Sequence, residues 1–284
     1  MAASRVDLHI HTTVSDGTWT PEEAAREAIA CDMIAIAITD HDDVAGVAPA
    51  AAVAEPAGIE VVPAVEIDTD YADSDVHVLG YYLDIENPDL LRLLARIREA
   101  RIERARKIID RLARLGCRIE EGRVLEIAGS GSVGRPHIAA AMVEAGCVTS
   151  VTQAFETLIG RGAPAFVQRY RLLPAEAIQH VRNAGGIAVL AHPVKLRDDH
   201  IIEELIADGL QGIEAYHCDH SRPVAEHYRR LADQRGLLVT GGTDSHGMKA
   251  DRPVPMGSVR TPEACLHQLK EAWLASASPG GRSP

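Results

Sequence analysis

Short apolar runs rich in β-branched residues recur in the first and last thirds of the chain, with helical patterns between them. Runs of this length predict strands, and their alternation with helices is typical of an α/β barrel. The expected strands cover 6–11, 34–38, 59–66, 75–82, 187–191, 212–217 and 237–240, and the expected helices cover 20–31, 44–57, 174–184, 198–208 and 262–274.

The alternation of strands and helices stops after Asp84, and from about 87 to 162 the pattern is almost entirely helical. This change predicts a helical insertion between two parts of one barrel. We therefore expect barrel segments at 1–86 and 166–275 and a helical insertion at 87–165. The remaining residues, 276–284, are small, polar and proline-rich, so we expect a disordered tail.

Two histidines, His9 and His11, close the first predicted strand. Strand alternation puts both imidazoles on one face, where they can reach the same point. Zinc and manganese accept such imidazoles, and the carboxylate of Asp16 just beyond the strand can serve the same site or a neighbouring one. Taken alone, the pair fits hydrogen-bonded core or rim histidines equally well.

Other predicted strands also end in side chains that bind metals. His41, His192, Asp244 and His246 each follow a short apolar run. In a barrel of parallel strands the C-terminal ends open onto one face, so residues far apart in sequence meet there. The repeated placement favours a metal site over isolated structural histidines.

Two further candidates lie on the third and fourth predicted strands. Glu66 closes an apolar run, and its two carboxylate oxygens can each bind one metal ion; the alternative is a helix cap or a rim salt bridge. His77 alternates with apolar residues, a pattern that also fits a hydrogen-bonded core histidine. The presence of Glu66 nearby favours ligation by His77.

An arginine-rich stretch of the helical insertion is a candidate phosphate site. Arg98 and Arg101 lie one turn apart on one side of the predicted helix. Guanidinium groups match phosphate oxygens in bidentate fashion, so the pair can hold a substrate phosphate over the barrel mouth. Periodicity alone favours a solvated helix face, and we assign no phosphate contact to Arg104 or Arg106.

The glycine-rich stretch 129–137 is a second candidate in the insertion. Its glycines let backbone amides approach an anion, and a helix begins near Pro136, so Gly134, Arg135 and His137 can contact a phosphate or a sugar. The spacing is not that of a P-loop. A flexible linker that caps a helix explains the composition equally well.

Three polar residues follow the later strands. Lys195 is a candidate phosphate contact, although a solvent-exposed loop lysine is the plainer interpretation. His217 is a candidate for substrate contact or proton transfer, and His220 is expected at the surface.

Composition limits the possible functions. The chain has 284 residues, 46% of them hydrophobic, which suffices for a barrel-sized core. The formal net charge of −12 argues against coating of long nucleic acids. The five cysteines lack close pairing or CxxC spacing, which predicts free thiols in a reducing compartment. No apolar run reaches membrane-spanning length and no signal-peptide pattern is present, so we expect a cytoplasmic protein.

These motifs together resemble the PHP (polymerase and histidinol phosphatase) domains of the amidohydrolase superfamily. The likeness runs from Arg5 to about Leu274 and implies a distorted (β/α)7-type barrel with a small inserted helical domain over the active site. Within this family, the order of the motifs and the presence of an arginine-rich helix most resemble the phosphoesterases that act on small molecules. The matching residues are His9-Ile10-His11, Ser15-Asp16-Gly17, Thr39-Asp40-His41, Glu66, His77, Ala191-His192-Pro193 and Asp244-Ser245-His246.

The resemblance implies three divalent ions per chain, of manganese, zinc or iron. A water between two ions about 3.5–4 Å apart would lose a proton near neutral pH and attack phosphorus. Asp16 and His217 are the candidates for protonating the leaving group. The implied ligands are His9, His11, Glu66 and Asp244 for one ion, Glu66, His77 and His192 for the second, and Asp16, His41 and His246 for the third, with Asp42 as an alternative to Asp16.

Three functions remain open on the sequence. The first is hydrolysis of phosphate esters of small molecules, such as a nucleotide, a nucleoside 3',5'-bisphosphate or a cyclic sugar phosphate. The second is an exonuclease-like phosphodiesterase that acts on the 5' ends of short oligonucleotides. The third is a non-catalytic, metal-stabilised interaction module. The sequence leaves the oligomeric state open.

Overall fold

The computed structural model describes residues 5–71, 74–129, 133–168, 170–196, 198–248 and 253–277. The chain forms two compact units, one made of Met1–Arg92 and Leu172–Pro284 and the other of Leu93–Arg171. Their boundaries differ by a few residues from the expected 87 and 165. No helix in these ranges is both long and apolar enough to span a membrane.

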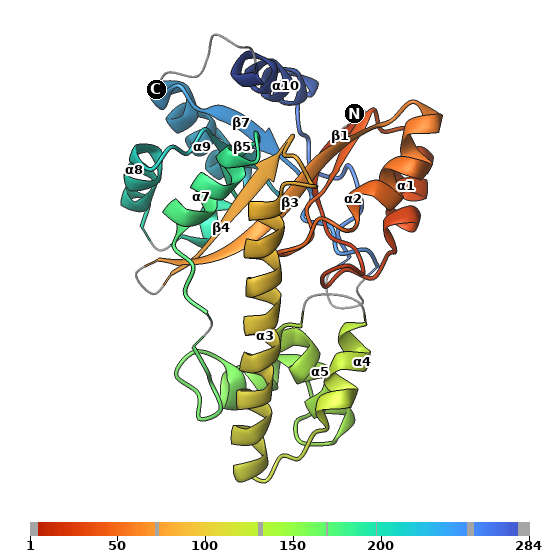
Figure 1. The fold of residues 1–284 in the computed structure, drawn as a ribbon, viewed down its shortest axis with the longest axis vertical. Coiled ribbons are helices and arrows are strands. Elements are labelled where there is room, and N and C mark those ends of the chain that lie inside the picture. The colour runs from red at the N-terminus through yellow and green to blue at the C-terminus, as the bar shows by residue number, and fades with distance from the viewer. Residues whose placement is uncertain are drawn as a thin grey trace. The chain divides into compact units, whose positions relative to one another are not determined.

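Seven strands form one sheet in the order β1 to β7 and build the nearly closed α/β barrel of the first unit (Figure 1). A bridge between Ile10 and Ser245 joins the two edges. The predicted fold class is therefore confirmed. The strands are β1 (Val6–Ile10), β2 (Ala35–Ile38), β3 (Glu60–Tyr71), β4 (Ser74–Tyr81), β5 (Ile187–Leu190), β6 (Gly212–Tyr216) and β7 (Leu238–Gly241).

The expectation of parallel strands is wrong for β4, which runs antiparallel to both β3 and β5. The reason is the connection: Tyr71 pairs with Ser74 across a link too short for the crossover of a dozen or more residues that a parallel pair needs. β3 also continues to Tyr71, so Glu66 lies within the strand rather than at its end. Because β4 is reversed, His77 near its start lies at the same barrel end as the ends of the parallel strands.

Helices surround this barrel in the first unit. Thr20 accepts the backbone N–H of Glu23, and Glu23 accepts that of Thr20, which confirms the expected helix start. Ser276 and Ala277 belong to the last helix rather than to the expected tail, whose residues 278–284 lie outside the described residues. The helices are α1 (Pro21–Ala30), α2 (Val47–Ala54), α7 (Pro174–Asn183), α8 (His200–Ala207), α9 (Arg222–Arg235), for which the pattern predicts no element, and α10 (Glu263–Ala277).

An apolar cluster fills the barrel at the end opposite His77. Leu8, Val62 and Tyr81 belong to it, and α10 adds Leu266 and Leu269. Tyr81 donates its hydroxyl proton to the carbonyl of Leu8 at 2.8 Å. Since this end is filled by side chains, the polar residues gather at the other end.

The second unit is helical and has its own core, to which Ile108, Leu112 and Met142 contribute. Cys117 and Cys147 form a disulfide with a Cα–Cα distance of 5.5 Å. The prediction of five free thiols is therefore wrong, because packing of helices brings together two cysteines 30 residues apart. The cysteines therefore no longer support the prediction of a reducing compartment, which assumed that all five were free thiols. The helices are α3 (Pro88–Arg114), which begins in the first unit, α4 (Glu121–Ala128), α5 (Arg135–Glu144), α6 (Val151–Ala154) and a π-helix (Phe155–Ile159).

Candidate metal centre

Four donor atoms converge at the open end of the barrel. The Nε2 atoms of His9 and His11 lie 3.1 Å apart. Oε2 of Glu66 lies 3.2 Å from the first and 3.1 Å from the second. Oδ1 of Asp244 lies 3.5 and 3.2 Å from the same two nitrogens. Two imidazole nitrogens and two carboxylate oxygens thus surround one position, and all four side chains are buried or nearly so.

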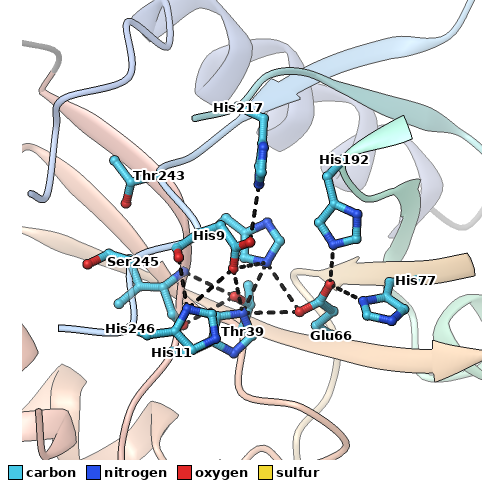
Figure 2. A network of polar contacts seen from close by, with 12 residues as sticks. His9, His11, Thr39, Glu66, His77, His192, His217, Thr243, Ser245 and His246 are labelled. Carbon is cyan, nitrogen blue, oxygen red and sulfur yellow. Dashed lines mark hydrogen bonds and ion pairs between the residues drawn. The ribbon is translucent and has the colours of Figure 1, made fainter. Parts of the chain in front are cut away.

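The second oxygen of Glu66 faces a different pair of histidines. Oε1 lies 2.8 Å from Nδ1 of His77 and 2.9 Å from Nε2 of His192. Figure 2 shows both rings pointing at this oxygen while His9 and His11 approach the other. Glu66 therefore has the geometry of a carboxylate shared between two positions.

A third group forms around His11. Asp16 Oδ1 lies 3.1 Å from Nε2 of His246, and these two residues, His11 and His41 have donor atoms within 4.8 Å of one another. The alternative residue, Asp42, instead accepts the backbone N–H of Asp68 at 3.0 Å. Geometry favours Asp16 over Asp42 in this group.

The donor set fits divalent cations. Burial raises the pKa of Glu66, but His41, His9 and His77 outweigh it and hold that pKa well below its ordinary range. The pKa of Asp244 is also lowered, because nearby histidines outweigh the effect of burial. Ionised oxygens and imidazoles are the ligands that zinc and manganese accept.

Three of the five non-glycine residues with positive φ in the described ranges lie at this end of the barrel. His192 has φ 26°, Asp244 has φ 54° and Asp42 has φ 55°, all in the left-handed region that residues with a Cβ rarely adopt. Such strain persists only where the surrounding structure holds it, and it is frequent at functional sites.

Two residues predicted at the rim, His217 and Lys195, approach the second carboxylate oxygen of Asp244, Oδ2. Nε2 of His217 lies 3.3 Å and Nζ of Lys195 lies 3.4 Å from Oδ2. The backbone N–H of Asp219 donates to Nδ1 of His217 at 3.0 Å, which places the proton of a neutral His217 on Nε2. His220, expected at the surface, is partly buried, and its Nδ1 lies 2.8 Å from the carbonyl of Ala215.

Comparison with known proteins places this geometry in a family. Residues 7–109 match the PHP domain. A Chromobacterium violaceum protein named 3',5'-nucleoside bisphosphate phosphatase is 33% identical over 251 residues, which cover 86% of this chain and 87% of that protein. The chain belongs to the PHP domain family. The resemblance drawn from the histidine motifs is thereby confirmed.

Two further proteins similar to this PHP chain extend the comparison. A Haemophilus influenzae protein named 5'-3' exoribonuclease is 32% identical over 247 residues, which cover 85% of this chain and 90% of that protein. A solved Bifidobacterium adolescentis structure, described as a candidate metal-dependent phosphoesterase, has a TM-score of 0.85 and 30% identity, with 99% of each chain covered. The likeness thus extends over both units of this PHP protein.

Sequence reasoning missed two carboxylates of this PHP site. Oδ1 of Asp68 lies 2.8 Å from Nδ1 of His41 and 3.5 Å from Nε2 of His77. Glu214, fully buried on β6, lies 2.9 Å from Nδ1 of His9. The available signals were the two-residue spacing of Glu66 and Asp68 on one strand face and a charged residue within the apolar strand of Glu214.

Two more buried aspartates hold the loops that carry candidate ligands. Asp7 accepts the backbone N–H of Thr243 at 2.8 Å and its hydroxyl at 2.7 Å. Asp40 accepts the backbone N–H of Thr12 at 2.7 Å and the hydroxyl of Ser15 at 2.6 Å. These contacts orient the segments before Asp244 and Asp16.

Of the predicted phosphate contacts in the helical unit, Arg101 and Gly134 lie close to each other. Nη1 of Arg101 is 4.0 Å from the position that a Cβ atom would occupy at Gly134, and Arg98 and Arg101 are half-buried. Arg135 lies over the ring of Phe155 at 5.4 Å. His137 accepts the backbone N–H of Gly134 at 3.0 Å and so caps α5. Residues 130–132 of the glycine-rich stretch lie outside the described residues.

Two other arginines of α3 have structural partners, consistent with their exclusion from the phosphate site. Arg104 donates to the carbonyl of Val167 at 2.8 Å. Arg106 donates to Glu121 at 2.8 Å on the surface.

Proposed function

We propose that this protein is a metal-dependent phosphatase that hydrolyses a nucleoside 3',5'-bisphosphate or a closely similar small phosphate ester. The observation that most strongly supports this proposal is the position of Glu66, whose two oxygens lie within 3.3 Å of nitrogens of five histidines. The name of the Chromobacterium violaceum relative supports this substrate class. The net charge of −12 is also consistent with a small substrate rather than a long polymer.

Three ions of manganese, zinc or iron would be held by the three groups of residues around Glu66. When bound, such ions neutralise charge on the phosphoryl oxygens and lower the pKa of the attacking water. The groups are His9, His11, Glu66 and Asp244; Glu66, His77 and His192; and Asp16, His41 and His246.

The protein's own residues would orient the substrate and stabilise the leaving oxygen. His217 is proposed to donate a hydrogen bond from Nε2 to the leaving oxygen, because the N–H of Asp219 leaves the proton of a neutral His217 on Nε2. Asp16 is assigned to the metal group rather than to proton transfer, since its Oδ1 faces His246. Lys195 is proposed to bind a substrate phosphate, as are the contacts of the helical unit, which are Arg98, Arg101, Gly134, Arg135 and His137.

A second candidate function is hydrolysis of short oligoribonucleotides from the 5' end. The name of the Haemophilus influenzae relative favours it, at nearly the same identity and coverage. Both reactions would use the same donor groups, so the substrate distinguishes them.

The test is a comparison of substrates with protein loaded with manganese or zinc. Phosphate release from adenosine 3',5'-bisphosphate is measured beside cleavage of a 5'-phosphorylated oligoribonucleotide of about five nucleotides. We expect a higher kcat/KM for the bisphosphate. A higher kcat/KM for the oligonucleotide would favour the second function, and hydrolysis of neither with any metal would refute both.

A further inference from the structure

Glu214 is a buried carboxylate whose two oxygens have different partners. Oε1 lies 2.9 Å from Nδ1 of His9 on β1, and Oε2 accepts the backbone N–H of His192 after β5 at 2.7 Å. Its side chain is 0% exposed. A buried charge is costly unless it is paired and hydrogen-bonded, so this residue has a specific role in holding its two partners.

The first contact determines how His9 can act. An ionised carboxylate only accepts hydrogen bonds, so His9 must donate from Nδ1. A neutral His9 then has its lone pair on Nε2, the atom that faces His11, Glu66 and Asp244.

The second contact holds a strained turn. His192 has φ 26° and ψ 61° and begins a 3-10 helix at Pro193–Lys195. Its backbone N–H donates to Glu214 while its Nε2 reaches Glu66 at 2.9 Å. The hydrogen bond therefore stabilises the conformation that directs the imidazole toward Glu66.

β6 itself is irregular at this point. Its pairing with β7 shifts register between Glu214 and Tyr216. Irregularities of this kind next to active sites re-aim side chains.

We propose that Glu214 is a positioning residue that sets the tautomer of His9 and holds the turn at His192, so that two metal ligands from two strands are oriented by one carboxylate. This inference rests on the proposed function, because it takes His9 and His192 as metal ligands. Carboxylates that accept from ligating histidines fix ring orientation and raise ligand basicity, and their loss costs about 10–100-fold in metal affinity.

Glu214→Gln tests the pairing because an amide has only one acceptor. If the amide oxygen accepts from His192, the NH2 group faces Nδ1 of His9 and favours the proton on Nε2, which removes the lone pair from the metal side. If the oxygen accepts from His9, two donors face each other at His192. Neither orientation satisfies both partners.

The experiment measures zinc affinity by competition with a chelator and the ring protons of His9 by NMR in the zinc-loaded protein. The matched control is Glu60→Gln, which removes a carboxylate from the far end of β3, where Glu60 accepts from Lys270 and Tyr82. We expect about a 10–100-fold weaker zinc affinity for Glu214→Gln and wild-type affinity for Glu60→Gln. In the wild type, we expect an exchange-protected proton on Nδ1 of His9.

The outcomes separate this inference from the proposed function. Glu214→Gln with wild-type zinc affinity and an unchanged Nδ1 proton would overturn the inference while leaving the phosphatase proposal intact. If Glu214→Gln does not fold, the wild-type spectrum decides, since a zinc-loaded protein with the proton of His9 on Nε2 contradicts the inference. A wild type that binds no divalent metal would refute both.

Discussion

Replacement of Glu66 by glutamine should be among the most damaging changes to this site. The variant keeps the shape of the side chain but loses its negative charge and one acceptor. If the NH2 group takes the place of Oε1, it meets His77 at 2.8 Å and His192 at 2.9 Å. If it takes the place of Oε2, it meets His9 and His11 at 3.2 and 3.1 Å. In either orientation one of the two positions faces a neutral NH2 group, which has no lone pair for a metal ion.

The size of the effect follows from the place of Glu66 between the two groups. Loss of a residue that only orients a metal ligand costs about 10–100-fold in metal affinity or activity. Because Glu66 faces both groups itself, we expect its replacement to lower turnover by more than about 100-fold.

The assay compares turnover of adenosine 3',5'-bisphosphate, metal content and circular dichroism for wild type, Glu66→Gln and the control Glu60→Gln. We expect both variants to be folded and only Glu66→Gln to lose bound metal and activity. A folded Glu66→Gln protein with wild-type metal content and turnover would refute the shared-carboxylate interpretation.

Two other predictions concern the metals and the helical unit. A strong chelator should abolish turnover and lower the melting temperature by about 5–10 °C, because metal at about 100 times its Kd stabilises the fold by about 2.7 kcal/mol; an unchanged melting curve and activity after verified removal of metal would count against the site. Arg101→Ala should lower kcat/KM by about 10–100-fold at constant metal content. Arg106→Ala, which loses a surface contact with Glu121, is the matched control, and equal kinetics for the two variants would show that Arg101 binds no substrate phosphate.

Much of the barrel could be predicted from local pattern. The alternation of residues in a strand suffices to place His9 and His11 on one side, and apolar runs that end in polar residues locate His41, His192 and Asp244 near one another once a barrel is assumed. The PHP likeness also rests on these short motifs. Each motif spans only a few consecutive residues, so it can be recognised in the sequence without knowledge of the fold.

Other features were decided only by tertiary structure. The direction of β4 depends on its pairing with β3 and β5, and the Cys117–Cys147 disulfide depends on the packing of helices. The division of the histidines between the two oxygens of Glu66 depends on strand register and side-chain direction together.

Glu214 marks the limit of sequence reasoning most clearly. Its partner His9 is 205 positions away in the chain, and no local pattern couples the two. The alternation within β6 identifies a charged residue in an apolar strand but does not identify what it contacts. Only the pairing of strands around the barrel brings this carboxylate to His9 and His192, because those contacts arise from closure of the sheet rather than from neighbours along the chain.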